Sequence, residues 1–404
     1  MYYFNHSIPA GNGTELNPYQ IATLDDLLWL SNTESAWVSG TNFIQTSDID
    51  ASDTANWNNG AGFNPIGIDN ITPFKGIYNG SNYFISNLYI NRPAENNIGL
   101  FGYCSDSYTE IKNVELRNLD ITGNEFVGGL IGYSIYDVYI SNVETSGSVI
   151  GFNRVGGIVG RMFENVSLLD SNSNTSVTGN DGVGGLAGDA IQNSLINNCH
   201  SSGNVTGNDD VIGGLIGSIS YSTEVTNCYA ETNVVGVDLY IGGLIGYVRD
   251  CQVTKCFSNS DVDGGFNHNG GLIGYLRESD LTNCYSRGNV EGIHTVGGLI
   301  GYNSSDSSVE NCYSTCMVTG SFYLGGFIGI NSSIVNNCVW NNETSNQVNG
   351  MSEESSGTIN NLLSCTTLEM QDQTTYTNIG WDFIDETING TDDIWDIDAN
   401  LNDG

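Results

Sequence analysis

The pentapeptide Gly242-Gly243-Leu244-Ile245-Gly246 decides the fold, because close copies of it recur along most of the chain. Full or near copies end at Gly102, Gly132, Gly160, Gly188, Gly217, Gly246, Gly274, Gly301 and Gly329. Successive final glycines lie 27 to 30 residues apart. A fixed period of about 20–50 residues is typical of a solenoid, in which each repeat buries its apolar face against its neighbours.

Each repeat has the pattern of three short strands joined by turns. In one representative repeat, apolar or β-branched runs occupy 195–199, 204–206 and 211–217, and Gly, Asn, Asp and Ser separate them. None of these runs shows helical spacing. The sequence therefore predicts an all-β fold, a parallel β-helix (β-solenoid) with about 28 residues and three short strands per coil.

Stacked coils place equivalent residues in columns, because neighbouring strands lie about 4.8 Å apart. The Leu of the pentapeptide forms one column, and its fourth residue forms the next. That second column includes Ile131, Ile216, Ile245, Ile273, Ile300 and Ile328. In a straight strand adjacent residues face opposite sides, so this column would be an exposed stripe for self-assembly. A bend at the paired glycines would instead turn both columns inward.

Two further columns contain Cys and Asn. The cysteine column holds Cys199, Cys228, Cys256, Cys284, Cys312 and Cys338. Val143 takes the same place in another coil, so we expect these thiols to be small buried side chains that are mostly reduced. The residue before each is usually asparagine, as at Asn198 and Asn227. Asparagine tolerates a left-handed backbone, so this column predicts a ladder of turns.

Composition limits the partners and the compartment. The chain has 10 Lys plus Arg against 46 Asp plus Glu, a net charge of −36. Such a chain is repelled by nucleic acid and by anionic membranes. It has no apolar run long enough for membrane insertion. Eleven Asn-x-Ser/Thr sequons favour an extracellular or cell-surface location, and a glycan there requires an outward-facing side chain. The sequons begin at Asn5, Asn12, Asn70, Asn79, Asn165, Asn174, Asn204, Asn303, Asn331, Asn342 and Asn389.

The period divides the chain into an N-terminal cap with irregular first coils at 1–92, regular coils at 93–345 and an irregular C-terminal cap at 346–404. Residues 23–30 predict a short cap helix with Thr23 as its N-cap. Asp398, Asn400 and Asn402 have the spacing of half a calcium-binding loop. Calcium is the one cofactor that the sequence suggests, and otherwise we expect none.

The repeats between Ile98 and Ile330 resemble the GLUG motif. That motif occurs in repeat regions of bacterial and archaeal surface proteins, including filamentous adhesins and immunoglobulin A peptidases. The flanks look similar too, at Asn17-Pro18-Tyr19-Gln20-Ile21 and at Pro73-Phe74-Lys75-Gly76. The resemblance implies an adhesin-like surface β-solenoid. It carries over no catalytic residue, because the motif is structural.

The sequence favours a non-enzymatic extracellular structural or adhesive protein, acting as a surface rod, an adhesin module or a filament subunit. Its expected partners are other copies of itself or a surface glycan or protein. The alternative is a polysaccharide-active enzyme, a lyase or hydrolase on a β-helix scaffold. A hydrolase needs two carboxylates about 5–9.5 Å apart. Asp48 with Asp50 and Asp209 with Asp210 fit this no better than other acidic residues, so we assign no catalytic residue.

Overall fold

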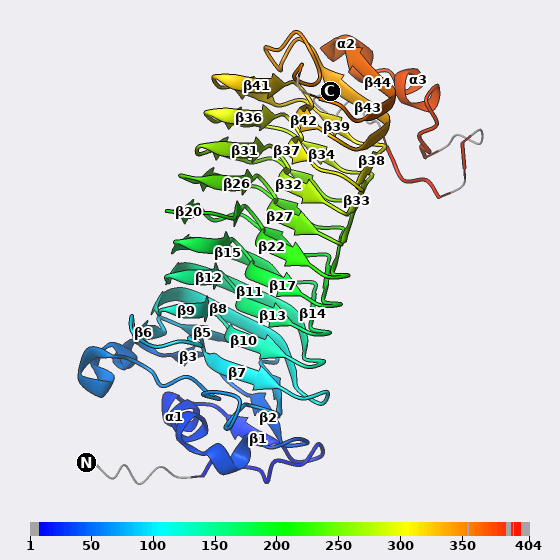
Figure 1. The fold of residues 1–404 in the computed structure, drawn as a ribbon. Coiled ribbons are helices and arrows are strands. Elements are labelled where there is room, and N and C mark those ends of the chain that lie inside the picture. Colours follow the sequence, from blue (N-terminus) through cyan, green and yellow to red (C-terminus); the bar gives the residue numbers. More distant parts are fainter. Residues whose placement is uncertain (1–7, 354, 385–388, 391, 397–404) are drawn as a thin grey trace. The chain divides into compact units, whose positions relative to one another are not determined.

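The computed structural model describes residues 8–353, 355–384, 389–390 and 392–396 of the 404-residue chain. The protein is all-β, with about 50% strand and 8% helix, and it coils into a parallel β-solenoid of about 12 turns (Figure 1). The predicted fold class is therefore confirmed. The coils belong to two compact units, which are described one at a time: residues 1–208 with 215–224, and residues 209–214 with 225–404.

The first unit begins with a capped helix, α1 (Leu24–Asn32). The hydroxyl of the N-cap residue Thr23 accepts a hydrogen bond from the backbone N–H of Asp26. The Asp26 carboxylate in turn accepts one from the backbone N–H of Thr23. This capping box satisfies N–H groups that a helix start leaves unpaired. The helix buries Leu27 and Leu30 completely, so it closes over apolar side chains.

Each regular coil of the first unit contributes strands to three parallel sheets. The first sheet contains β1 (Tyr19–Ile21), β2 (Asn42–Gln45), β3 (Ile49–Asp50), β4 (Ile77–Asn79), β5 (Phe84–Ser86), β6 (Tyr89–Asn91), β8 (Glu110–Thr122), β11 (Tyr139–Ile150), β14 (Ser167–Leu169), β15 (Asn172–Gly179), β18 (Leu195–Asn197), β19 (His200–Ser201) and β20 (Val205–Gly207). The second contains β9 (Glu125–Gly128), β12 (Asn153–Gly156) and β16 (Asp181–Gly184). The third contains β7 (Phe101–Ser105), β10 (Ile131–Ile135), β13 (Val159–Phe163), β17 (Ala187–Ile191) and β22 (Ile216–Ser220). Two 3-10 helices, η1 (Glu34–Ala36) and η2 (Ser52–Gly60), interrupt the irregular first coils.

The second unit repeats the same three strand positions. Its first-sheet strands are β23 (Glu224–Thr226), β24 (Tyr229–Ala230), β25 (Asn233–Val235), β28 (Gln252–Thr254), β29 (Phe257–Ser258), β30 (Asp261–Asp263), β33 (Asp280–Thr282), β34 (Tyr285–Ser286), β35 (Asn289–Glu291), β38 (Ser308–Glu310), β39 (Tyr313–Ser314), β40 (Met317–Thr319), β43 (Ile334–Asn341) and β44 (Thr358–Cys365). The second sheet has β21 (Ile212–Gly213), β26 (Leu239–Gly242), β31 (Asn267–Gly270), β36 (His294–Gly297) and β41 (Phe322–Gly325). The third has β27 (Ile245–Arg249), β32 (Ile273–Arg277), β37 (Ile300–Asn303) and β42 (Ile328–Asn331).

The paired glycines bend the chain between the second and third sheets. In the second unit β26 ends at Gly242 and β27 begins at Ile245. A Cβ atom on Gly242 would lie 2.0 Å from the carbonyl oxygen of Ile245, and one on Gly243 would lie 2.1 Å from that of Gly271. No side chain fits at such distances, so only glycine permits this close approach of backbones. Leu244 and Ile245 are consequently both fully buried.

The exposed assembly stripe predicted from the pentapeptide is therefore wrong. All six of its residues have no exposed surface: Ile131, Ile216, Ile245, Ile273, Ile300 and Ile328. The alternative, in which a bend at the paired glycines turns both columns inward, is the one that the structure shows.

The cysteine column lies in the core, as predicted. Its six members are at most 1% exposed: Cys199, Cys228, Cys256, Cys284, Cys312 and Cys338. All ten cysteines of the chain are buried free thiols in the structure. Burial raises the pKa of Cys256, Cys284 and Cys312 well above its usual value, so these thiols stay protonated.

The asparagine column takes up the predicted left-handed turns. The φ angle lies between 50° and 56° at Asn142, Asn198, Asn227, Asn283, Asn311 and Asn337. Amides also bond along the column: Nδ2 of Asn142 donates to Oδ1 of Asn113 at 2.8 Å. The column therefore fixes the turn and joins successive coils.

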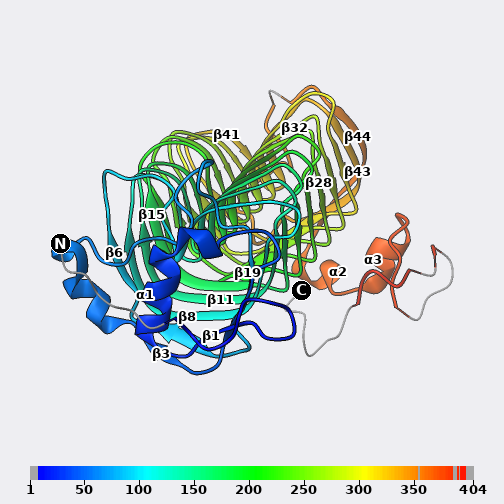
Figure 2. The same cartoon turned by 90° about the horizontal axis from the view of Figure 1, so that it is seen from below.

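After β43, the second unit adds one more strand and two short helices. β44 pairs with β43 in parallel, from Thr358 beside Ile334 to Cys365 beside Asn341. The chain then enters α2 (Thr367–Met370) and α3 (Gln373–Thr377). Figures 1 and 2 place α3 at the side of these coils. Buried residues of this segment form a cluster with Tyr313 on β39 and Val339 on β43, and they are Cys365, Met370, Tyr376, Trp381 and Phe383.

Candidate functional site

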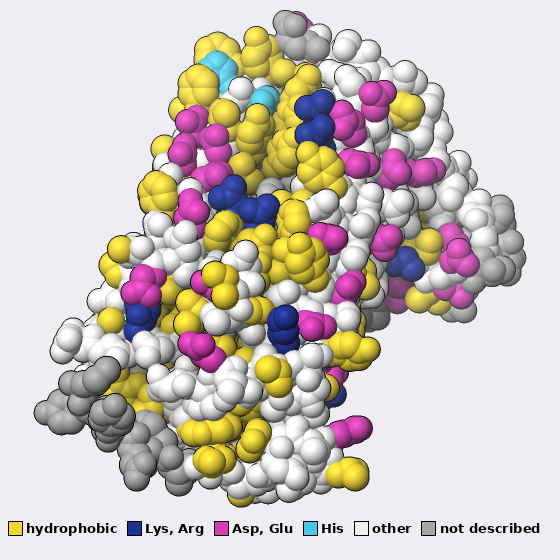
Figure 3. Space-filling view, turned by 60° about the horizontal axis from the view of Figure 1, so that its bottom comes forward, with side chains coloured by type: hydrophobic (Ala, Val, Ile, Leu, Met, Phe, Trp, Pro, Cys, Tyr) yellow, Lys and Arg dark blue, Asp and Glu magenta, His cyan; other side chains and the backbone are white. Residues whose placement is uncertain are grey.

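The bend brings outward-facing side chains of the second and third sheets together in a concave corner. In the second unit partly buried rings fill it, and we call them the aromatic corner: Tyr240, Tyr247, His268, Tyr275 and Tyr302. Tyr240 on β26 meets Tyr247 on β27 edge to face, with ring centroids 5.6 Å apart. Tyr247 stacks on Tyr275 at 5.5 Å. Figure 3 shows hydrophobic side chains gathered in a band, with basic and histidine side chains beside it.

His268 lies in the middle of the aromatic corner. Its ring stacks on Tyr240 at 5.4 Å and on Tyr302 at 5.3 Å, and its φ angle is 60°. Its Nδ1 atom is buried, and none of the described residues forms a hydrogen bond with it. Burial lowers the pKa of His268 to about 4, so the ring is neutral at pH 7. A neutral imidazole among tyrosines makes this site aromatic rather than cationic.

A charged triplet borders the aromatic corner. Nε of Arg249 lies 3.3 Å from Oε2 of Glu278, and Nη2 of Arg277 lies 3.0 Å from its Oε1. The hydrogen bond from Arg277 is the main reason that the pKa of Glu278 is lowered. All three side chains are partly exposed. The border therefore offers both hydrogen-bond donors and acceptors to a ligand.

The equivalent corner of the first unit contains a more buried ion cluster. Nε of Arg154 and Nε of Arg161 lie 3.2 and 3.6 Å from Oδ2 of Asp189, whose side chain is 5% exposed. Oδ1 of Asp189 is also buried, and within the described part of the chain it has no hydrogen-bond partner. Phe126 lies below both guanidinium groups, each 5.6 Å from its centroid. Burial raises the pKa of Asp189 to about 6, although Arg161 and Arg154 oppose the shift.

A second set of rings runs along the outward face of the first sheet in the second unit. Tyr229, Phe257, Tyr285 and Tyr313 stack with centroids 4.7 to 4.8 Å apart, and successive ring planes differ by at most 5°. We call them the aromatic ladder. Nη2 of Arg287 donates to the hydroxyl of Tyr313 at 2.9 Å. Because the faces of these rings cover one another, the ladder presents mainly ring edges and stabilises neighbouring coils.

Among the described residues, three carboxylates of the second unit are close enough to hold a metal ion together. Asp209, Asp210 and Asp238 offer oxygen atoms that lie within 4.8 Å of one another. Oδ1 of Asp210 also accepts a hydrogen bond from the backbone N–H of Leu239. Carboxylate oxygens are ligands for hard cations such as calcium. The calcium candidates predicted at the C-terminus, Asp398, Asn400 and Asn402, lie outside the described residues.

Comparison with known proteins identifies the repeat. The family described as the GLUG motif matches residues 292–316. Residues 292–316 therefore carry the GLUG motif. The matched segment lies in the second unit and contains β36, β37, β38 and β39 with the paired-glycine bend between the first two. The predicted resemblance to GLUG-motif proteins is thus confirmed, and the motif is a set of residues that shape one coil.

Two curated proteins have sequences similar to part of this chain. Halomucin of Haloquadratum walsbyi is 36% identical over 148 residues, which are 37% of this chain and 2% of halomucin. A protein of Evansella cellulosilytica described as a Gly-rich membrane protein is 37% identical over 139 residues, 32% of this chain and 15% of that protein. The chain therefore spans a small part of the length of the relatives it matches. No helix in the described part of the chain is long and apolar enough to cross a membrane.

One solved structure has a distant likeness to this chain. It is a protein from Bacteroides ovatus described as an immunoglobulin A1 protease, with a TM-score of 0.44 and 24% identity over 63% of this chain and 79% of that one. A likeness of this size carries no functional argument.

The structure separates the predicted glycosylation sites by exposure. The asparagine is exposed at Asn12, Asn70, Asn165, Asn174 and Asn204, and partly exposed at Asn79, Asn342 and Asn389. Asn303 and Asn331 are wrong as candidates, because both are fully buried. Nδ2 of Asn303 donates to Oδ1 of Asn331 at 2.7 Å, which shows an internal amide contact between coils. Asn5 lies outside the described residues.

The acidic pairs considered for hydrolysis have structural hydrogen bonds. Oδ1 of Asp48 accepts from the backbone N–H of Phe84, and Oδ1 of Asp50 accepts from that of Ser52. Sequence reasoning missed Asp238 beside Asp209 and Asp210, and it missed the aromatic corner. The periodic tyrosines that follow the pentapeptide, such as Tyr247 and Tyr275, were the available signal for the corner.

Proposed function

We propose that this chain is a non-enzymatic, extracellular adhesive module of a cell-surface protein, and that its aromatic corner binds a surface glycan. The observation that carries the proposal is the corner itself, where partly exposed rings from successive coils lie beside a charged triplet. The relative described as a membrane protein supports a surface location. Association between copies of the chain belongs to the same proposal.

The chemistry of the aromatic corner suits a ligand that is rich in hydroxyl groups. Each sugar hydroxyl has one hydrogen-bond donor and two acceptor lone pairs. It can therefore accept a hydrogen bond from Arg249 and donate one to Glu278. The tyrosine rings add apolar contact surface with a polar edge. The net charge of −36 repels acidic polymers. We therefore propose a neutral glycan rather than an acidic one.

The test is binding of the purified protein to a panel of neutral and acidic polysaccharides, with product release measured in parallel. We expect saturable binding to a neutral glycan without turnover. Tyr247→Ala in the aromatic corner should weaken binding about tenfold, which corresponds to about 1.4 kcal/mol. The matched control is Tyr229→Ala, which removes a stacked tyrosine from the aromatic ladder and should leave binding unchanged.

Each other outcome of this test counts against the proposal. Turnover of a polysaccharide would favour the alternative class, a lyase or hydrolase on a β-helix scaffold. Absence of binding to every glycan would remove the adhesive role of the aromatic corner. An equal loss of binding in both tyrosine variants, with both folded by circular dichroism, would place the binding surface elsewhere.

A further inference from the structure

β44 is an unpaired sheet edge in the last coil of the second unit. Its eight residues, Thr358–Cys365, pair with β43 along one side, and no described residue pairs with the other side. The strand contains no charged residue and no proline. Natural proteins protect edge strands with such residues, because an unprotected edge pairs readily with another strand.

The same strand leaves core positions uncovered. Ile359 lies beside Val335 and Leu362 beside Cys338 in the ladder. Val335 and Cys338 are fully buried, whereas Ile359 is 48% exposed and Leu362 is partly exposed. Inward-facing residues lose their cover only where the ladder stops. A further strand along β44 would bury both apolar side chains, and that burial favours association.

Two amide ladders also stop at β44. Nδ2 of Asn360 donates to Oδ1 of Asn336, and Nδ2 of Asn361 donates to Oδ1 of Asn337, both at 2.9 Å. Within the described part of the chain, no group donates to the amide oxygens of Asn360 and Asn361. The edge therefore offers hydrogen-bond acceptors as well as an unpaired backbone.

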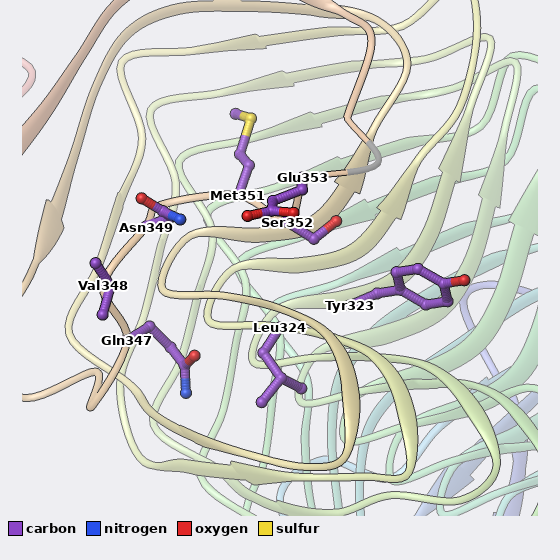
Figure 4. Close-up of a pocket in the computed structure, with 8 residues that line it drawn as sticks. All are labelled: Tyr323, Leu324, Gln347, Val348, Asn349, Met351, Ser352 and Glu353. Carbon is purple, nitrogen blue, oxygen red and sulfur yellow. The ribbon is translucent and has the colours of Figure 1, made fainter.

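The last coil of the second sheet is incompletely covered as well. β41 is the terminal strand of that sheet, and a pocket of about 340 Å³ lies between it and residues 347–353. Figure 4 shows Tyr323 and Leu324 lining this pocket with Val348 and Met351. Leu324 is partly exposed, whereas its ladder neighbour Val296 is fully buried. The terminal coil thus has open apolar positions on two of its sheets.

The first strand of the chain does not offer a matching edge. The backbone N–H of Gln20 on β1 donates to the carbonyl oxygen of Ala10, and Ile21 is fully buried. Head-to-tail addition of a second copy would have to displace this segment. Two identical open edges, in contrast, complement each other about a twofold axis.

We propose that two copies of this chain associate through β44, which pairs with β44 of the second copy in antiparallel orientation about a twofold axis. The inference rests on the self-association included in the proposed function, and it names the surface. It predicts a closed pair rather than an open filament. Because each copy carries a net charge of −36, salt screens the repulsion and strengthens the pair.

Sedimentation velocity over a range of protein concentrations, at about 0.1 M and about 1 M NaCl, tests the pair. We expect a monomer–dimer equilibrium that shifts toward the dimer with salt. Ile359→Lys should raise the dissociation constant of the dimer by at least about tenfold, equal to about 1.4 kcal/mol. The matched control is Val235→Lys, at a 39% exposed strand position of β25, and it should leave the constant unchanged.

A cross-linking experiment tests the orientation. All native cysteines are buried, so Asn360→Cys supplies an accessible thiol on β44. A short thiol-specific cross-linker should join two copies of this variant, and it should not join copies of Asn32→Cys, whose thiol would lie on α1. Cross-linking through position 32, or a dimer that neither variant traps, would overturn the pairing of the two β44 strands.

Other results of the sedimentation and glycan-binding experiments also test the proposed β44 pair. A wild type that is monomeric at every concentration and salt, or equal effects of the two lysine variants, would overturn the inference. Glycan binding by Ile359→Lys separates it from the proposed function, because the aromatic corner is unchanged in that variant. Loss of the dimer with retained glycan binding supports both proposals. A retained dimer without glycan binding in the wild type leaves the pair and removes the adhesive role.

Discussion

The beginning and the end of the coil ladder are finished in different ways. In the first unit, α1 follows β1, and Ile21, Leu27 and Leu30 are all fully buried. In the second unit, α2 and α3 follow β44, but Ile359 on that strand remains 48% exposed. Met370 on α2 and Tyr376 on α3 belong instead to a cluster that contains Tyr313 of β39.

This difference shows that the ladder and its caps are separate features of the molecule. A ladder needs only a constant period, because each coil is covered by the next. A cap needs an amphipathic element whose apolar face matches the exposed end. α1 supplies such an element at the closed end, and no described element supplies it at β44. Mutations at the two ends should therefore differ in their effect on stability.

The largest difference is expected from truncation of one apolar residue at each end. Leu27→Ala should lower the free energy of unfolding by about 2–5 kcal/mol, because the side chain of Leu27, on the inner face of α1, is fully buried. Ile359→Ala should lower it by about 1 kcal/mol or less, because half of that side chain is already in water. Urea denaturation of dilute protein measures both values. Equal losses would show that β44 is covered as fully as β1.

Acid should change the free energy of unfolding in opposite directions through one buried group in each unit. In the first unit, burial raises the pKa of Asp189 from 3.8 to about 6, so the folded chain holds a proton that the unfolded chain releases. This contribution to stability is present below about pH 4 and is lost as the pH rises through about 6. In the second unit, burial lowers the pKa of His268 from 6.5 to about 4. That contribution is present above about pH 6.5 and is lost as the pH falls through about 4.

Two variants measure these opposite contributions to the slope of the free energy of unfolding against pH. On acidification the protonation of Asp189 stabilises the wild type by roughly 1–3 kcal/mol, and Asp189→Asn should remove this gain. His268→Gln should remove the loss of stability that acid causes through His268. Urea denaturation between about pH 4 and 6.5, with each variant compared to wild type, gives the change in slope. Slopes that change in the same direction for both variants would contradict the burial of one of the two groups.

The smallest effect is expected at the helix caps. Thr23 and Thr366 both begin a helix with a capping box, at α1 and α2 respectively. Thr23→Ala should cost about 1 kcal/mol, because α1 closes the core. Thr366→Ala should cost less than about 0.5 kcal/mol, because α2 is a four-residue helix. Thermal unfolding of the two variants makes the comparison, and the reverse order would show that the C-terminal helices also hold the ladder together.

The local parts of this structure were predictable from the sequence. The spacing of the pentapeptide predicts coils, Thr23 with Asp26 marks the start of α1, and the Val143 substitution places the cysteines in the core. Asparagine at the turn position predicts the left-handed conformation that Asn198 adopts, with a φ angle of 54°. Each of these rests on a residue and its near neighbours in the chain, or on an exact repeat.

The remaining features depend on contacts between coils. The direction of the bend depends on the carbonyl oxygen of Gly271, which lies one coil away from Gly243. The same bend brings Tyr240 and Tyr247 together, so the aromatic corner could not be placed before the bend was known. Asn303 has the sequence of a glycosylation site, but its strand turns the side chain inward onto Asn331. Asp238 meets Asp209 only because the ladder aligns their coils.

Hydrogen–deuterium exchange of β1, β43 and β44 in dilute protein tests most directly whether one end is closed and the other open. We expect slow exchange at β1 and β43 and faster exchange at β44, because unpaired edge amides open most easily. Raising the protein concentration should slow exchange at β44 alone. Two results would contradict a closed end at β1 and an open end at β44. One is protection of β44 equal to that of β43 at the lowest concentration, and the other is exchange at β1 as fast as at β44.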